Sequence, residues 1–253
     1  MGKELGYLSK FRKSFEISYY ETDKNKNLKP TSLLNLLGEI AGEHSSTIVK
    51  IDRLEALNYA WMLHRWKVRI DRYPKAKEKI IIETWSSSID RFYANREFFI
   101  YDEKEEVIGK ASTFWIFVDI KKKRPIRIPE ELQLGYKEID ERAFDEFYDF
   151  KEKINIVDHL DFHVRRSDID YNNHVNNTVY LDWMVEAVPE EIYDNYLLRE
   201  FEILYKKEIK YGNTILSGIN EINVNKHNKV FFHNIVHKET EASHALGITI
   251  WEK

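Results

Sequence analysis

The sequence predicts an α+β fold made of two related units, each a long helix packed against an antiparallel sheet. Three observations lead to this prediction: a polar loop that occurs twice, an amphipathic helix that follows each loop, and a run of strand-like segments after each helix. The 253 residues suit two modest domains, and a hydrophobic content of 43% is enough for two cores.

A constant spacing relates the two loops. Asp170 follows Asp23 by 147 residues, and the same spacing matches Asn25 with Asn172, Leu28 with Val175, and Glu39 with Glu186. His174 corresponds to Asn27, so the first copy has lost its imidazole. Because histidine exchanges protons near neutral pH and asparagine does not, only the second copy is expected to support acid–base chemistry.

The helix after each loop is recognised by one apolar face. In the first copy it begins near Pro30 and carries Leu33, Leu34, Leu36, Leu37, Ile40 and Ala41. In the second copy it ends before Pro189 and carries Val179, Tyr180, Trp183, Met184, Ala187 and Val188.

The strands that follow are rich in aromatic and β-branched residues. In the first half we expect them at Trp61–Ile70, Ile80–Ser88, Arg91–Tyr101 and Val107–Ile120. In the second half we expect them at Phe201–Lys210, Thr214–Val224, Lys229–His237 and Ala242–Trp251. Residues 102–104 and 225–228 have the composition of hairpin turns.

These elements divide the chain into an N-terminal domain at 1–125, a linker at 126–157 and a C-terminal domain at 158–253. Pairing of the two sheets into one continuous sheet would remove exposed strand edges. Within the linker, the acidic and aromatic segment Glu138–Lys153 is a candidate helix.

Composition excludes several classes of protein. A net charge of −4 argues against nucleic-acid binding, which needs a surplus of Lys and Arg. The absence of cysteine excludes disulfides and thiolate chemistry and fits a reducing compartment. We find no signal peptide or membrane span, so we expect a cytoplasmic protein. Asp158–His163 contains ligand-type residues but lacks a partner cluster, so we expect no metal and no cofactor.

Basic residues gather in two places. One group comprises Lys121, Lys122, Lys123, Arg124 and Arg127, hereafter the basic strip, and the other comprises Arg65, Lys67, Arg69 and Arg72. Such groups usually only solvate a surface. The alternative is that one of them, with the basic strip as our candidate, binds an acidic partner.

Several motifs resemble those of the acyl-(acyl carrier protein) thioesterases of fatty acid synthesis, in their bacterial form. Residues 168–177 resemble the family's active-site loop, and Tyr205-Lys206-Lys207-Glu208 resembles its second catalytic segment. Further landmarks occur in the family's order at residues 72–74, 83–85 and 124–129. The resemblance extends over nearly the whole chain and implies two tandem hot dog domains.

The resemblance also implies an activity and a site. We expect hydrolysis of an acyl chain from the 4′-phosphopantetheine arm of acyl carrier protein, with Asp170, Asn172, His174 and Glu208 as the catalytic residues. Ile209 stands where many plant members carry cysteine, which excludes a mechanism that needs that thiol. Residues 75–78 lack the Trp-Gly usually found after Tyr-Pro.

The residue types suit thioester hydrolysis by direct attack of water. His174 can move a proton, and Glu208 would become a competent base if an acyl tunnel desolvated it and raised its pKa. Asn172 can donate to the carbonyl oxygen, with Asp170 as the orienting group. Ser167 lacks the Gly-x-Ser-x-Gly context of a serine nucleophile.

Other interpretations remain open at this stage. His174 could be a satisfied core histidine, and Glu208 could be an exposed edge charge like Glu202. Asn176 and Asn177 are better explained as helix caps. Rival functions are an acyl-coenzyme A thioesterase, a hydratase or dehydratase of the same fold, and a non-catalytic lipid carrier. Acyl chain preference is not readable from the sequence, and the protein could be a monomer or a homodimer.

Overall fold

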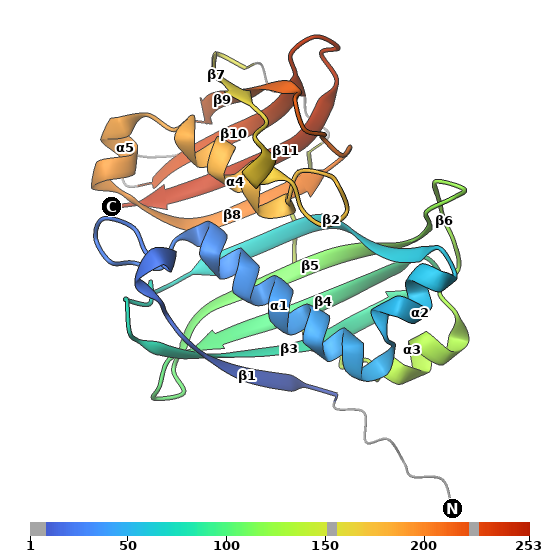
Figure 1. The fold of residues 1–253 in the computed structure, drawn as a ribbon. Coiled ribbons are helices and arrows are strands. Elements are labelled where there is room, and N and C mark those ends of the chain that lie inside the picture. Colours follow the sequence, from blue (N-terminus) through green and yellow to red (C-terminus); the bar gives the residue numbers. More distant parts are fainter. Residues whose placement is uncertain (1–8, 151–155, 223–227) are drawn as a thin grey trace, which may run out of the picture. The chain divides into compact units, whose positions relative to one another are not determined.

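The computed structural model describes residues 9–150, 156–222 and 228–253, and its contacts divide them into two compact units (Figure 1). The first unit contains residues 9–64 and 72–145, and the second contains residues 65–71 together with the described residues from 146 onwards. Among the described residues, no helix combines the length and apolarity needed to cross a bilayer.

The first unit is a helix on an antiparallel sheet. Its main strands are hydrogen-bonded in the order β1-β3-β4-β5, and the N-terminal part of β2 follows β5. Their bounds are β1 Phe11–Glu16, β2 Tyr59–Ile70, β3 Lys79–Asp90, β4 Tyr93–Tyr101 and β5 Val107–Asp119, with a short β6 at Arg124–Pro125. The helices are α1 Pro30–Ile48, α2 Ile51–Ala56 and α3 Glu130–Tyr136.

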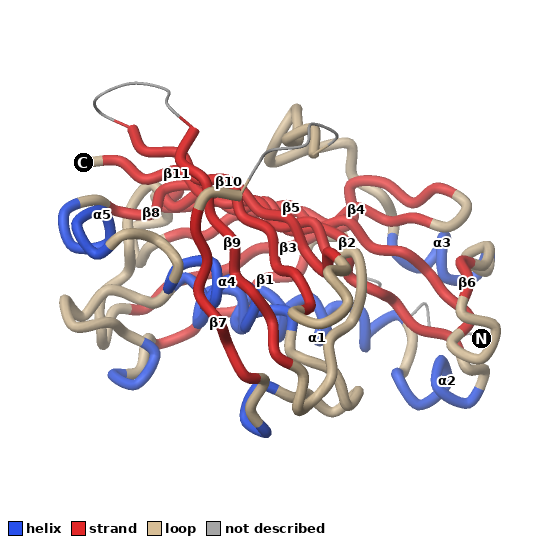
Figure 2. The backbone as a smooth tube through the Cα atoms, turned by 90° about the horizontal axis from the view of Figure 1, so that it is seen from above, coloured by secondary structure: helices blue, strands red, loops and turns tan. Residues whose placement is uncertain are grey.

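Helix α1 lies across one face of this sheet (Figures 1 and 2). It begins at Pro30, where proline's fixed φ and missing N–H are compatible with a first helical turn. Its buried residues include all six that the sequence predicted for the apolar face, together with His44. At its end, Val49 is extended and donates its backbone N–H to Ser45.

The second unit repeats this arrangement. Strand order is β8-β11-β10-β9-β7, and residues 65–69 of β2 pair with β8. The bounds are β7 Asp158–His163, β8 Leu197–Tyr205, β9 Thr214–Ile222, β10 Asn228–His237 and β11 Ser243–Glu252, with helices α4 Asn177–Glu186 and α5 Glu190–Asn195. Helix α4 approaches the sheet closely at Gly247, where an added Cβ would lie 2.5 Å from Met184 Sδ.

The predicted α+β class is therefore confirmed, and most predicted strands lie where we expected them. The sequence missed β1 and β7, and it extended β8 through Lys210 although the strand ends at Tyr205. The proposed helix at Glu138–Lys153 is wrong for its described part, because residues 137–150 contain none. Residues 151–155 and 225–227 lie outside the described residues, and the predicted domain boundaries stay a prediction.

Glu202 corrects a second expectation, because it is buried with 2% of its surface exposed rather than an edge charge. The segment at 146–150 covers it: Tyr148 donates its backbone N–H to Glu202 Oε2 at 3.0 Å, and Arg65 forms an ion pair with the same carboxylate. Burial raises the pKa of the Glu202 carboxyl, against the opposing effects of the Tyr148 N–H and Arg65. The covering segment is distant in sequence, so the strand pattern gave no sign of it.

The predicted basic group at residues 65–72 is neutralised by carboxylates. Besides the Arg65–Glu202 pair, the structure contains the pairs Lys67–Glu200 at 3.4 Å, Arg69–Asp71 at 2.8 Å and Arg72–Glu78 at 2.6 Å. These cations serve local ion pairs, so this group is not a surplus of positive charge for an acidic partner.

His233 is fully buried in the second unit, beside Gly247 on the neighbouring strand β11. Its Nε2 lies 2.8 Å from Thr249 Oγ1, while Nδ1 has no hydrogen-bond partner in the described part of the chain. Burial lowers the pKa of His233 to about 3, because the charged imidazolium would lose its hydration.

This shift predicts a loss of stability in acid. The unfolded chain gains a proton at this histidine near pH 6.5, whereas the folded chain gains it only near pH 3. Between these values His233 should lower the free energy of unfolding by up to about 1.4 kcal/mol for each unit that the pH falls. The check is chemical unfolding at pH 7, 6, 5 and 4 for the wild type and for His233→Gln, whose amide can still hydrogen-bond to Thr249. The free energy of unfolding of the variant should fall less steeply as the pH is lowered. Identical slopes would contradict a neutral His233 in the folded protein.

Candidate active site

The two loops share their geometry as well as their spacing. Strand β7 follows β1 by 147 residues at both ends, and α4 begins 147 residues after α1. Between strand and helix, a short 3-10 turn at Tyr19–Glu21 corresponds in the same register to one at Arg166–Asp168. The duplication inferred from the sequence therefore extends to the backbone.

Hydrogen bonds within the loops repeat as well. Asp170 donates its N–H to the carbonyl of His174, and Asp23 donates to that of Asn27, both at 2.8 Å. Asn173 and Lys26 each have a φ of 63°, a left-handed conformation that asparagine tolerates better than lysine. The loop is therefore built by its backbone, and both copies keep this frame whether position 174 or 27 carries histidine or asparagine.

A second register relates the segments that follow β2 and β8. Val175 donates its N–H to the carbonyl of Ile209 at 2.9 Å, and in the first copy Leu28 donates to Pro74 at 2.8 Å. Ile209 follows Pro74 by 135 residues, and the same spacing relates the positive-φ residues Lys77 and Gly212 and the first residues of β3 and β9.

In this register Glu208 corresponds to Tyr73. The first copy thus has Asn27 and Tyr73 where the second has His174 and Glu208, so it lacks both members of the pair. Its asparagine has another role, because Lys75 Nζ donates to Asn27 Oδ1 at 2.6 Å. The sequence revealed only the missing histidine, because residues 71–79 and 206–214 share almost no identities.

His174 and Glu208 are in contact, with His174 Nε2 3.1 Å from Glu208 Oε2. The two side chains converge as predicted, but their surroundings differ from the expectation. Glu208 lies in the loop after β8, with 59% of its side chain exposed, and 31% of the His174 side chain is exposed. The predicted desolvation of Glu208 is therefore wrong for the protein without a bound substrate.

Asp170 and Asn172 lie on the same loop. Asp170 Oδ1 accepts the N–H of Asn172 at 2.9 Å and that of His174 at 3.4 Å, and its Oδ2 accepts from Asn172 Nδ2 at 3.3 Å. Asp170 thereby fixes both residues, and one amide N–H of the exposed Asn172 remains for another acceptor. Asn176 caps α4 by accepting the N–H of Thr178 at 3.0 Å, as predicted, whereas Asn177 is the first residue of the helix and not its cap.

Three side chains to which the sequence analysis gave no role of their own in the site, Tyr180, Tyr205 and His244, connect the segments that carry His174 and Glu208. Tyr205 Oη donates to the carbonyl of Asn177 at 2.8 Å, and Tyr180 Oη donates to that of Lys207 at 3.4 Å. His244 Nδ1 lies 3.2 Å from the same Lys207 carbonyl. A carbonyl can only accept, so His244 must carry its proton on Nδ1.

Burial controls the protonation of these supporting residues. It raises the pKa of Tyr180, and the nearby Glu208 and Asp170 carboxylates raise it further. It lowers the pKa of His244, a shift that the neighbouring His237 reinforces. Tyr180 therefore stays a hydrogen-bond donor at working pH, and His244 is neutral there.

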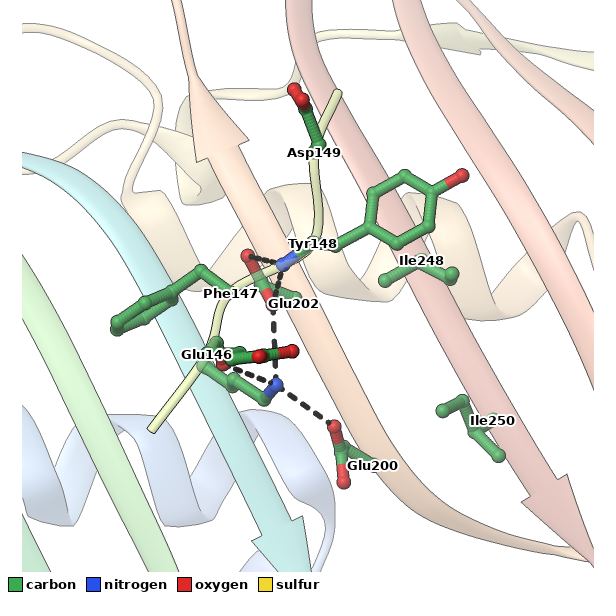
Figure 3. A pocket seen from close by; sticks show the side chains of 9 residues that line it. Glu146, Phe147, Tyr148, Asp149, Glu200, Glu202, Ile248 and Ile250 are labelled. Carbon is green, nitrogen blue, oxygen red and sulfur yellow. Dashed lines mark hydrogen bonds and ion pairs between the residues drawn. The ribbon is translucent and has the colours of Figure 1, made fainter. Parts of the chain in front are cut away.

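A pocket of about 330 Å³ also lies in the second unit, and Figure 3 shows the side chains that line it. It is formed by the segment at Glu146–Asp149 over Ile248 and Ile250, and includes Lys67, Glu200 and Glu202. It shares no residue with the His174–Glu208 pair. Within the described residues, no group of three or more His, Cys, Asp or Glu side chains could hold a metal ion.

The predicted basic strip lies on the surface of the first unit, where all five of its cations are exposed. Lys122 pairs with Asp119 at 3.3 Å, and this carboxylate also accepts the Lys122 N–H. Nothing in the geometry of the strip tests whether it binds a partner, so that role stays a prediction.

Fold and loops define the class: the chain consists of two hot dog units in tandem, and the second carries His174 and Glu208 where the first has Asn27 and Tyr73. The family model for the acyl-ACP thioesterase N-terminal domain matches residues 8–136, and the model for the C-terminal domain matches residues 151–253. The chain belongs to the acyl-ACP thioesterase family.

Individual relatives agree with this assignment. An oleoyl-acyl carrier protein thioesterase of Coriandrum sativum is 24% identical over 81% of this chain and 61% of its own length. A dodecanoyl-[acyl-carrier-protein] hydrolase of Cinnamomum camphora is 26% identical over 82% of this chain and 58% of its own length. Both are chloroplastic proteins, and the present chain spans about three fifths of their length.

Solved structures show the same fold. A putative oleoyl thioesterase from Lactobacillus plantarum matches with a TM-score of 0.87 and 22% identity, covering 98% of each chain. An acyl-ACP thioesterase from Bacteroides thetaiotaomicron matches with a TM-score of 0.85 and 24% identity, covering 96% of this chain and 98% of the other. The tandem hot dog architecture is thus shared along nearly the whole chain.

Proposed function

We propose that this protein hydrolyses the thioester between an acyl chain and the pantetheine arm of acyl carrier protein. The observation that carries the proposal is the His174–Glu208 contact at 3.1 Å, present in the second copy of a duplicated loop and replaced in the first. Family membership supplies the substrate class, and the products are a free fatty acid and the carrier's thiol.

In the proposed reaction, water attacks the thioester carbonyl carbon directly. The His174–Glu208 pair accepts a proton from the water as the new C–O bond forms. Collapse of the tetrahedral intermediate breaks the C–S bond, and the same proton passes to the departing thiolate. The pair therefore returns to its starting protonation state, and no covalent acyl-enzyme is needed.

Asn172 is the proposed donor to the carbonyl oxygen. One of its amide N–H groups is held by Asp170, which leaves the second for the negative charge that develops on the substrate. Asp170 acts as the positioning residue, because its carboxylate holds the backbone of both Asn172 and His174.

Because the His174–Glu208 pair is partly exposed, the bound substrate itself would have to shield it from water. Water at Glu208 weakens electrostatic interactions, and a bound pantetheine arm and acyl chain would exclude that water. The first unit, without histidine or glutamate at the matching positions, is the proposed pocket for the acyl chain. Its interior would set the preferred chain length.

The decisive assay is thiol release from acyl carrier protein loaded with a panel of acyl chains. His174→Ala and Glu208→Gln should each lower kcat by roughly 10²–10⁴-fold, the usual contribution of a positioned acid or base. Asn27→Ala is the matched control, because it changes the corresponding residue of the other loop and should keep kcat within about twofold of wild type.

Each rival has its own outcome in this assay. Faster release from acyl-coenzyme A than from the carrier protein would favour the coenzyme A thioesterase. Loss of water from a hydroxyacyl chain without release of thiol would favour a dehydratase, and no reaction at all would favour a lipid carrier. An acyl adduct on Glu208 or Asp170, trapped by rapid quench, would overturn the direct attack of water.

His244 provides a test of how Glu208 is held. His244→Leu removes a donor to the Lys207 carbonyl next to Glu208, and kcat should fall by about 3–10-fold, as expected for one hydrogen bond. His244→Asn should restore most of the rate, because its amide can donate from near the position of Nδ1. Steady-state kinetics should show the change in kcat with little change in KM, and an Asn variant as slow as the Leu variant would contradict the positioning role.

A further inference from the structure

We propose that the acidic carrier protein docks on the rim of the catalytic loop itself, on a surface that the sequence did not identify. This catalytic rim consists of the cations Arg166, Lys206, Lys207 and Lys210 and the tyrosines Tyr171 and Tyr211. The inference rests on the proposed function and adds the location of the partner to it.

The catalytic rim is continuous with the proposed active site. Lys206 and Lys207 immediately precede Glu208, and Lys210 follows it by two residues. Arg166 belongs to the 3-10 turn that leads into the loop of His174, and its guanidinium lies 4.5 Å from the ring centre of Tyr211. An acidic carrier protein bound here would place its prosthetic arm directly beside His174 and Glu208.

The rim cations differ from most other cations of the second unit because they have no carboxylate partner among the described residues. All four are exposed, and none takes part in a salt bridge within residues 9–150, 156–222 and 228–253. The adjacent Arg165, in contrast, pairs with Asp168 at 2.8 Å. Unpaired surface cations retain their full attraction for an acidic partner, whereas paired ones are already neutralised.

The duplication provides an internal comparison. In the registers of 147 and 135 residues, Arg166 corresponds to Tyr19, and Lys206, Lys207 and Lys210 correspond to Asp71, Arg72 and Lys75. Asp71 is an anion, Arg72 pairs with Glu78, and Lys75 donates to Asn27. The first copy therefore lacks a free cationic rim as well as the catalytic pair. Both features occur together in the second copy, as a docking surface beside its own active site requires.

The two tyrosines add the apolar part of a protein interface. Tyr171 is 85% exposed and lies on the catalytic loop, and Tyr211 is 48% exposed. Exposed tyrosines contribute large contact areas at low conformational entropy, and interfaces are enriched in them. The rim thus combines charge for steering with aromatic surface for binding.

The test reverses the rim charges and compares them with the basic strip predicted from sequence. The rim variant carries Lys206→Glu, Lys210→Glu and Arg166→Glu, and the strip variant carries Lys121→Glu, Lys123→Glu and Arg127→Glu. A single reversal in a turn of the first unit, Lys104→Glu, serves as the control for added negative charge. Lys207 is left unchanged because it directly precedes Glu208, where a new carboxylate would act on the catalytic pair itself.

The measured quantity is the ratio of kcat/KM on the carrier-linked thioester to kcat/KM on a small soluble thioester. The rim variant should lower this ratio by about tenfold or more, and it should weaken the loss of rate that added salt causes in wild type. The affinity for the unacylated carrier protein should be measured with the His174→Ala enzyme. Adding the rim changes to this enzyme should lower that affinity in parallel with the fall in the kcat/KM ratio.

The outcomes separate the two proposals. If the wild type releases no thiol from the carrier protein, the proposed function fails. If the wild type is active but the rim variant keeps the wild-type ratio and carrier affinity, the docking proposal fails. A fall in the ratio for the strip variant, without one for the rim variant, would place the partner on the first unit and overturn the assignment made here.

Discussion

A single backbone hydrogen bond, from Val175 to the carbonyl of Ile209, joins the two segments on which the site depends. It connects the loop that carries His174 to the turn that carries Glu208, and both residues adjoin the bonded positions. Two tyrosines strengthen the connection: Tyr180 on α4 donates to the Lys207 carbonyl, and Tyr205 at the end of β8 donates to the Asn177 carbonyl at the start of α4. Since the corresponding bond exists in the first copy, the frame does not depend on His174 and Glu208, and the proposed chemistry needs only these two side chains placed on it.

The charged side chains of the second unit fall into two groups, those paired with carboxylates and those exposed around Glu208. Arginine and lysine beside the sheet of the second unit face carboxylates, and the pair Arg65–Glu202 is buried by the segment at 146–150. A charge removed from water needs a partner of opposite sign, so these cations neutralise carboxylates of the fold and are not available to another molecule. In the described part of the chain, the exposed cations around Glu208 have no such partner, and their charge can act on another molecule.

Sequence reasoning succeeded where the signal was local. The spacing of Asp23 and Asp170 predicted both loops, and the apolar faces predicted α1 and α4, because helical periodicity is encoded in consecutive residues. It failed where burial depends on distant segments: Glu202 is covered by residues more than fifty positions away. The correspondence of Glu208 with Tyr73 was also hidden, because backbone geometry rather than residue identity preserves it. The environment of Glu208 was misjudged because a substrate, rather than the chain, would have to enclose it.

The bond between Lys75 and Asn27 has an evolutionary consequence. Restoring histidine at position 27 would remove the acceptor of Lys75 and place its ammonium group near a new imidazole. Restoring glutamate at position 73 would put a carboxylate where a tyrosine is now only 8% exposed. Each change alone would disturb a present contact of the first loop without forming a histidine–glutamate pair. The first copy could therefore match the second at these positions only through both substitutions together.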